Sequence, residues 1–179
     1  LALTELEVGT DSVSRLPELT TSNFAYRISV PDKPSEYYVL ENRQQQGWDR
    51  FLPGHGMLMW HIDVDTAEWV GNSANTIGGH QLIDIIEADK ILSENTRNAD
   101  AFPGADNIRT WDIEAWSGRQ LMTLEEIDET NGMIKFIQQG TAYKMSQPTE
   151  IIVSNIEDSC FTLTWHEVSD ATYYILSIS

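Results

Sequence analysis

Short runs rich in β-branched, aromatic and long aliphatic residues recur along this chain, each bounded by glycine, proline, asparagine or aspartate. The clearest runs cover residues 37–40, 56–64, 81–86 and 133–137. Such runs are typical of β-strands. No stretch of about eleven residues keeps its apolar positions at helical spacing, and only 66–70 and 123–127 are expected to form single helical turns. The pattern predicts an all-β domain with a mainly antiparallel, β-sandwich-like fold.

Alternation along the run that starts at residue 57 decides which side of the sheet each side chain occupies. One face carries Leu58, Trp60, Ile62 and Val64, and the other carries Met57, Met59, His61, Asp63 and Asp65. Because the first face is the apolar one, we expect it to face the core. The run around Ile83 is apolar on both faces, which predicts a central strand that is covered on each side. Asp84 then needs a polar partner.

Two long irregular segments, 66–79 and 90–116, are rich in asparagine, aspartate, glycine and tryptophan. Loops of this length usually carry a ligand, an ion or a partner contact. The strand pattern lapses around residue 140 and resumes at Pro148. We therefore predict a first domain over 1–140, a linker over 141–147 and a second, incomplete module over 148–179.

Charge and composition restrict the partners of this chain. Its 179 residues include 11 basic and 28 acidic side chains, a formal net charge of −17. This charge repels phosphate backbones, so nucleic acid is excluded as a partner, and it attracts hard cations. No apolar run approaches the length of about 18 residues that predicts a membrane span. The single cysteine, Cys160, has no intrachain disulfide partner and is expected to fill a core position.

Several short motifs follow one another between residues 36 and 138. They are EYYVLENRQ at 36–44, GWD at 47–49, LPG at 52–54, GMLMWHID at 56–63, IEAD at 86–89 and FPG at 102–104. In this order and spacing they resemble the region after the catalytic domain in immune-inhibitor-A-like metallopeptidases. The resemblance implies a non-catalytic accessory region of a secreted or cell-surface bacterial zinc metalloendopeptidase. Its partner would be the catalytic domain, which this chain lacks.

Zinc catalysis in that family needs a helical His-Glu-x-x-His motif, which places two imidazoles one turn apart and supplies a general base. The four histidines do not begin such a motif: they are His55, His61, His80 and His166. No catalytic residue is therefore assigned to this chain, which is expected to be inactive by itself. The resemblance assigns the zinc to the catalytic domain of the parent protein.

A second resemblance begins at Pro148. The segments 148–153, 161–165 and 171–176 look like strands A, B and C of a fibronectin type III module, with Leu163, Trp165, Tyr173 and Ile175 at its usual core positions. Such modules need about seven strands in about 100 residues, whereas only 32 residues run from Pro148 to Ser179. We expect a truncated module whose exposed edge is covered by a partner.

Polar side chains stand near the ends of three predicted strands: Glu41 and Arg43, His61 and Asp63, Glu87 and Asp89. If the ends converge, the oxygens of Asp63, Asp65, Glu87 and Asp89 form a calcium site. One alternative is a metal-free polar network of Glu41, Arg43, His61 and Asp84 that orders the strand ends, and another is that these ends are simply solvated. The loop 95–112 also holds carboxylates, although turn chemistry accounts for them without an ion.

Two rival functions belong to other classes. Tryptophan richness favours a carbohydrate- or protein-binding β-sandwich of the cell surface, in which the stacking residues are Trp48, Trp60, Trp69, Trp111 and Trp116. The other rival is an enzyme that uses Asp63 and Glu87 as its acid and base. Only the distance between these two carboxylates decides whether the second rival is feasible.

Overall fold

The computed structural model describes residues 1–64, 66–76, 81–140, 151–155 and 161–165. The chain divides into two compact units, Leu1–Ala142 and Tyr143–Ser179. The division falls within the segment 141–147 that the sequence suggests as a linker. Each unit is described by itself.

The first sheet of the larger unit has five strands in the order β1-β3-β4-β5-β6. Their bounds are Ala2–Glu5 for β1, Phe24–Ser29 for β3, Glu36–Arg43 for β4, Gly56–Asp63 for β5 and Ile83–Ile85 for β6. Neighbouring strands are antiparallel, except that β1 runs parallel to β3.

β6 corrects the expectation of a central strand around Ile83, because it lies at the edge of this sheet among the described residues. The side chain of Asn75 covers the edge. It accepts hydrogen bonds from the amides of Leu82 (2.6 Å) and Ile83 (3.1 Å) and donates to the Ile83 carbonyl (2.6 Å). An edge strand is thereby protected from pairing with another chain. The apolar residues on both faces of β6 do not signal a central position.

The second sheet has four strands in the order β2-β9-β8-β7. Their bounds are Ser12–Leu16 for β2, Trp111–Glu114 for β7, Gln120–Thr130 for β8 and Met133–Gly140 for β9. The helical turn predicted at 123–127 is wrong, since these residues belong to β8. A bulge between Glu125 and Asp128, where Glu126 has φ 50°, interrupts the alternation there.

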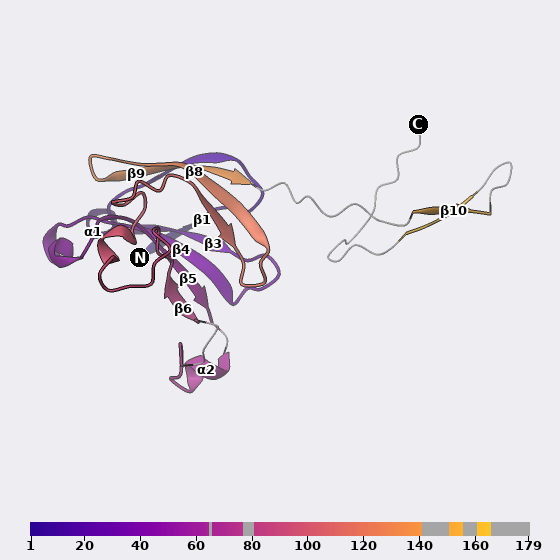
Figure 1. Ribbon diagram of the computed structural model, residues 1–179, viewed down its shortest axis with the longest axis horizontal. Coiled ribbons are helices and arrows are strands. Elements are labelled where there is room, and N and C mark those ends of the chain that lie inside the picture. Colours follow the sequence, from indigo (N-terminus) through magenta and orange to yellow (C-terminus); the bar gives the residue numbers. More distant parts are fainter. Residues whose placement is uncertain (65, 77–80, 141–150, 156–160, 166–179) are drawn as a thin grey trace. The chain divides into compact units, whose positions relative to one another are not determined.

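The two sheets pack face to face around one apolar core (Figure 1). Leu40 and Met59 of the first sheet and Leu124 and Phe136 of the second are 0 % exposed members of this core. Among the described residues, helical structure is limited to α1 (Leu19–Ser22), α2 (Thr66–Val70) and the 3-10 turns η1 (Gly47–Phe51) and η2 (Arg97–Ala99). The predicted all-β, sandwich-like fold is confirmed, as is the predicted turn at 66–70. No helix in the described part of the chain is long and apolar enough to cross a membrane.

In the smaller unit, β10 (Ile152–Ser154) and β11 (Thr162–Thr164) form an antiparallel pair (Figure 1). These strands overlap the segments 148–153 and 161–165 that were compared above to strands A and B of a fibronectin type III module. Cys160 and the third segment, 171–176, lie outside the described residues.

Candidate functional site

The two faces of β5 are reversed relative to the sequence prediction. Met57 and Met59 are 0 % exposed, and His61 and Asp63 also point into the sandwich with exposures of 5 % and 1 %. The apolar side chains of the other face remain partly exposed on the outside of the first sheet, and these are Leu58, Trp60 and Ile62. Val64, expected in the core, is also exposed, and Asp65 lies outside the described residues. The first sheet thus has an apolar outer face.

Glu36 and Asp63 face each other across β4 and β5, and each is 1 % exposed. The Lys33 ammonium donates to Asp63 Oδ2 at 2.5 Å and lies 3.6 Å from Glu36 Oε2. Ser35 donates to the other Asp63 oxygen at 3.1 Å. Burial opposes the charge on Lys33, but the hydrogen bond and charge of Asp63, together with Glu36, hold the pKa of Lys33 above its ordinary value. Two buried carboxylates are therefore satisfied by side chains of their own neighbourhood.

His61 joins this cluster from β5. Its Nε2 lies 2.9 Å from Glu36 Oε1, and its ring stacks on Tyr38 with centroids 4.2 Å apart. The Tyr38 hydroxyl donates to the Glu114 carbonyl at 2.7 Å, and Glu36 Oε1 also accepts the Trp116 amide. Burial first, and then the charges of Glu36, Glu114 and Asp84, raise the pKa of Tyr38. These bonds connect β4 of one sheet to β7 and the turn after it in the other, so the cluster holds the sheets together.

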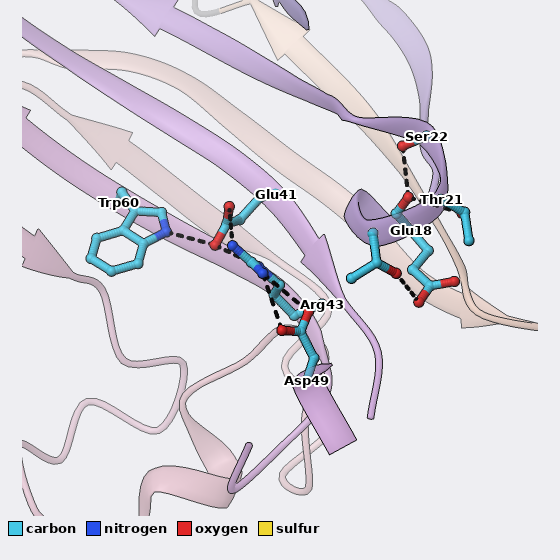
Figure 2. A network of polar contacts seen from close by, with 8 residues as sticks. Glu18, Thr21, Ser22, Glu41, Arg43, Asp49 and Trp60 are labelled. Atoms are coloured by element: carbon cyan, nitrogen blue, oxygen red, sulfur yellow. Dashed lines mark hydrogen bonds and ion pairs between the residues drawn. The ribbon is translucent and has the colours of Figure 1, made fainter. Parts of the chain in front are cut away.

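A second polar cluster surrounds Arg43 on the outer side of the first sheet (Figure 2). Arg43 donates to both oxygens of Asp49 at 3.0 and 3.2 Å and to both oxygens of Glu41 at 3.1 and 3.3 Å. The Trp60 indole donates to Glu41 at 3.0 Å. Gln45 adds a bond to the Leu52 carbonyl at 2.7 Å. The bidentate pairs fix the turn η1 against the end of β4.

The polar strand ends do not converge as the sequence suggested. β4 and β5 are antiparallel, with Glu36 opposite Asp63 and Arg43 opposite Gly56, so the Glu41–Arg43 pair lies at the other end from Asp63. Asp63 and Glu87 are also separated. The Ile86 amide donates to the Met59 carbonyl, so Glu87 follows at the level of Leu58. Five strand residues correspond to about 17 Å, which is too far for a shared calcium ion or for a carboxylate acid–base pair.

Of the predicted metal-free network, Glu41 and Arg43 are bonded to each other, whereas His61 belongs to the buried cluster. Asp84 lies opposite His61 across β5 and β6. With its amide nitrogen turned toward the carboxylate, Gln81 donates to both Asp84 oxygens at 2.9 and 3.0 Å. Asp89 accepts the Ile91 amide at 2.8 Å, as in an ordinary turn. The predicted network is therefore divided: Glu41 and Arg43 belong to one cluster, His61 belongs to the other, and Asp84 is bonded to Gln81.

The outer face carries two adjoining hollows that the sequence did not reveal. The first, about 360 Å³, is mostly apolar and is lined by Leu52, Pro53, Leu58, Ile85 and Ala101, with Arg43, His55 and Arg97 among its polar residues. The second, about 400 Å³, has Trp60, Ile83, Ile85 and Leu92 beside Asp84, Glu87, Glu94 and Asp100. The sequence feature that points to these hollows is the apolar side of β5, formed by Leu58, Trp60 and Ile62. It indicates them only if that side is assigned to the outer face of the sheet.

Three carboxyl groups that line the second hollow, those of Asp84, Glu87 and Asp100, have raised pKa values. Burial raises the pKa of Asp84, against the opposing effects of His61 and the Ile85 amide. Burial also raises the pKa of Glu87, and the neighbouring carboxylates Asp84, Asp100 and Asp89 add to this effect. For Asp100, burial and then Asp89 raise the pKa. In the described part of the chain, no three histidine, cysteine, aspartate or glutamate side chains are grouped as ligands for a metal ion.

The fold defines an all-β, sandwich-like protein. Buried polar side chains connect its two sheets, and the outer face of the first sheet is apolar. Comparisons with protein families, with curated proteins and with solved structures find no match.

Proposed function

We propose that this chain is a non-catalytic structural region of a secreted bacterial zinc metallopeptidase of the immune-inhibitor-A type. The motifs between residues 36 and 138 support the proposal by their order and spacing. Its role is to form a rigid body beside the catalytic domain, and the catalytic zinc belongs to that domain. The parent protein acts outside the cell on protein substrates.

The observation that carries this proposal is that the titratable residues inside the sandwich are buried and hydrogen-bonded to other protein groups. Glu36, Asp63 and His61 are deeply buried titratable groups of β4 and β5, and they bond to Lys33, to one another and to the opposite sheet. A general acid or base must reach a substrate proton. Groups that are buried and already bonded in this way stabilise a scaffold instead.

Protease assays of two proteins test the proposal. The complete product of the gene is expected to hydrolyse casein and to lose activity with a zinc chelator, whereas the 179-residue chain alone releases no peptides with or without added zinc. Chelator-sensitive hydrolysis by this chain alone contradicts the proposal. So does a complete gene product without a His-Glu-x-x-His segment.

Calcium is a separate proposal for the acidic residues after β6, Glu87 and Asp89. An ion that binds only the folded state raises the midpoint of thermal unfolding. Scans in calcium and in chelator, repeated for Asp89→Asn, test it: a calcium-dependent rise that the substitution removes is the expected result. An identical midpoint in both buffers rejects calcium at these residues.

The second candidate function is a carbohydrate- or protein-binding module, favoured by the exposure of Trp48. Its side chain is 97 % exposed on η1, a turn that Arg43 and Asp49 hold in place. Trp60 and Trp111 are partly buried and less accessible for stacking. A glycan array probed with the chain and with Trp48→Ala tests this candidate. Binding that the substitution removes supports it, and an array without signal counts against it.

A further inference from the structure

The outer face of the first sheet combines an apolar hollow and an acidic hollow in one groove. The two hollows share Ile85, Arg97 and Asp100 in their walls. The cross-strand row of Val39, Trp60 and Ile85 runs beneath them.

The apolar hollow has room for one large side chain of a partner. Leu52, Pro53 and Leu58 are among its apolar lining residues, and its volume of about 360 Å³ lies within the range of small ligand pockets. Arg43, which also lines it, is bonded to Glu41 and Asp49. Since this guanidinium is already neutralised by two carboxylates, the hollow selects for apolar groups.

The acidic hollow is lined by more carboxylates than cationic side chains. Asp84, Glu87, Glu94 and Asp100 line it together with a single guanidinium, that of Arg97, which pairs with Glu94 at 3.2 Å. Asp100 Oδ1 is buried without a hydrogen-bond partner in the described part of the chain. Burial and the charges of neighbouring carboxylates raise the pKa values of Glu87 and Asp100. A cationic group bound beside them relieves both costs.

We propose that this groove binds an extended peptide segment of a partner protein in which a bulky apolar side chain lies close to a lysine or arginine. The apolar side chain occupies the hollow around Leu58, and the cationic one lies beside Glu87 and Asp100, near Trp60. An ammonium or guanidinium fits this lining because it pairs with carboxylates and also packs on aromatic and aliphatic groups.

Exposed aromatic residues extend the groove beyond the hollows. Trp48 and Phe51 are 97 % and 80 % exposed on η1, and the next two residues, Leu52 and Pro53, line the apolar hollow. Tryptophan and arginine are the residue types that dominate binding energy at protein interfaces. The inference goes beyond the structural role proposed above, because it assigns a ligand chemistry to this chain.

Selection from a random octapeptide library on the immobilised chain, in buffer with EDTA, tests the inference. Recovered peptides are expected to carry a lysine or arginine within a few residues of a bulky apolar side chain. Fluorescence anisotropy then gives the affinity of a labelled member. Glu87→Gln and Leu58→Thr are each expected to weaken binding about tenfold, a loss that corresponds to about 1.4 kcal/mol. Glu114→Gln is the matched control. It removes an exposed carboxylate from β7 and is expected to leave binding unchanged.

Glu87→Gln also separates lost binding from lost folding, because relief of its unfavourable charge is expected to raise thermal stability while affinity falls. Recovery of no peptide motif, of motifs without a basic residue, or of peptides whose affinity Glu87→Gln leaves intact would overturn the inference. The protease assays of the proposed function do not depend on this groove, so the two proposals fail independently.

Discussion

Asn42 is a fully buried amide whose hydrogen bonds close one end of the sandwich. It is 0 % exposed, and its Nδ2 donates to the carbonyls of Leu16 (2.9 Å) and Gly132 (2.8 Å). Its Oδ1 accepts from Gln44 at 2.8 Å. One side chain of β4 thus serves the end of β2, the hairpin between β8 and β9, and the chain that follows β4.

Replacement of Asn42 by alanine is expected to lower the free energy of unfolding by about 3 kcal/mol, because buried carbonyl and amide groups lose their partners. Urea unfolding of the chain and the variant measures this change. Asn98→Ala, at an exposed asparagine, is the matched control and should change stability by less than about 0.5 kcal/mol. Equal effects of the two substitutions would show that the bonds of Asn42 contribute nothing.

Removal of the Glu87 charge is expected to stabilise the folded chain in a pH-dependent way. Its folded-state pKa is raised above the ordinary 4.5, chiefly by burial and then by neighbouring carboxylates. The folded chain therefore binds the proton more tightly than the unfolded chain, so this contribution to stability is full below pH 4.5 and is lost as pH rises through the folded pKa. Glu87→Gln is expected to raise the unfolding midpoint at pH 7 by on the order of 2 °C, since the residue is only partly buried.

The same comparison at pH 3.5 should show no gain, because Glu87 is then protonated in both states. Thermal scans of the chain and of Glu87→Gln at the two pH values make the measurement. A gain of equal size at both would assign the effect to packing rather than to charge.

The residue pattern correctly predicted the strand β5, but it assigned the wrong side of this strand to the core. Alternation divides its residues correctly, yet hydropathy places Leu58, Trp60 and Ile62 in the core. The interior instead takes the side that ends in His61 and Asp63, because Lys33 and Glu36 satisfy these polar groups. Lys33 and Glu36 lie about 30 residues earlier in the sequence, and no local pattern reveals that they meet β5.

At the scale of the element, the start of β5 depends on a close backbone approach. Gly56 has φ 126°, and a Cβ at this position would lie only 2.4 Å from the Phe102 carbonyl oxygen. The neighbouring amides and carbonyls of Met57 and Phe102 exchange two hydrogen bonds at 2.8 Å. The loop before β7 is thus attached to the first sheet at a place where no side chain fits.

Gly56→Ala is expected to destabilise the chain by at least twice as much as Gly118→Ala. Both positions have a positive φ, but a Cβ at Gly118 would meet nothing within 4 Å. The control therefore reports the conformational cost alone, about 1 kcal/mol. Chemical denaturation compares the two variants. If they lose the same stability, the approach of Phe102 to β5 is not restrictive.

Arg43 holds the turn η1 by contacting Glu41 through Nε and Nη2 and Asp49 through Nη1, whereas a lysine in its place has a single ammonium for both carboxylates. Arg43→Lys is expected to increase amide hydrogen exchange of residues 47–52 at least fivefold, with little change in the core strands. Residue-resolved exchange makes the measurement. Trp48→Ala is the control for the exposed face of η1 and should leave exchange of residues 47–52 unchanged. Uniform loss of protection after Arg43→Lys would indicate global destabilisation instead.

Elements were predictable where strands are long and bounded by turn residues, as with β4, β5 and β9. Two predictions were wrong. A helical turn was predicted where a bulge breaks the alternation in β8, and a central strand was predicted for β6, an apolar edge strand that Asn75 covers. Both cases depend on a partner strand or a distant side chain, which local periodicity does not contain. The two hollows of the outer face form for the same reason, since segments around residues 52, 85 and 100 meet only after folding.

At the scale of the whole molecule, the larger unit contains all the residues of its hydrophobic core, from Leu6 to Phe136. In the smaller unit, several large apolar residues in or beside the β10–β11 pair are exposed. They include Ile151, Ile152, Val153 and Phe161. The larger unit therefore has what it needs to fold independently, whereas the described hairpin of the smaller unit buries little of its apolar surface.

A chain that ends at Ala142 is accordingly expected to unfold cooperatively, with a midpoint within about 2 °C of the main transition of the full chain. Scanning calorimetry of both chains makes the comparison, because it reports the enthalpy of the transition as well as its midpoint. The truncated chain should keep nearly all of the unfolding enthalpy, since the sandwich and its polar clusters remain intact. A midpoint lowered by many degrees would show that residues 143–179 stabilise the sandwich, because loss of packing lowers both the midpoint and the enthalpy.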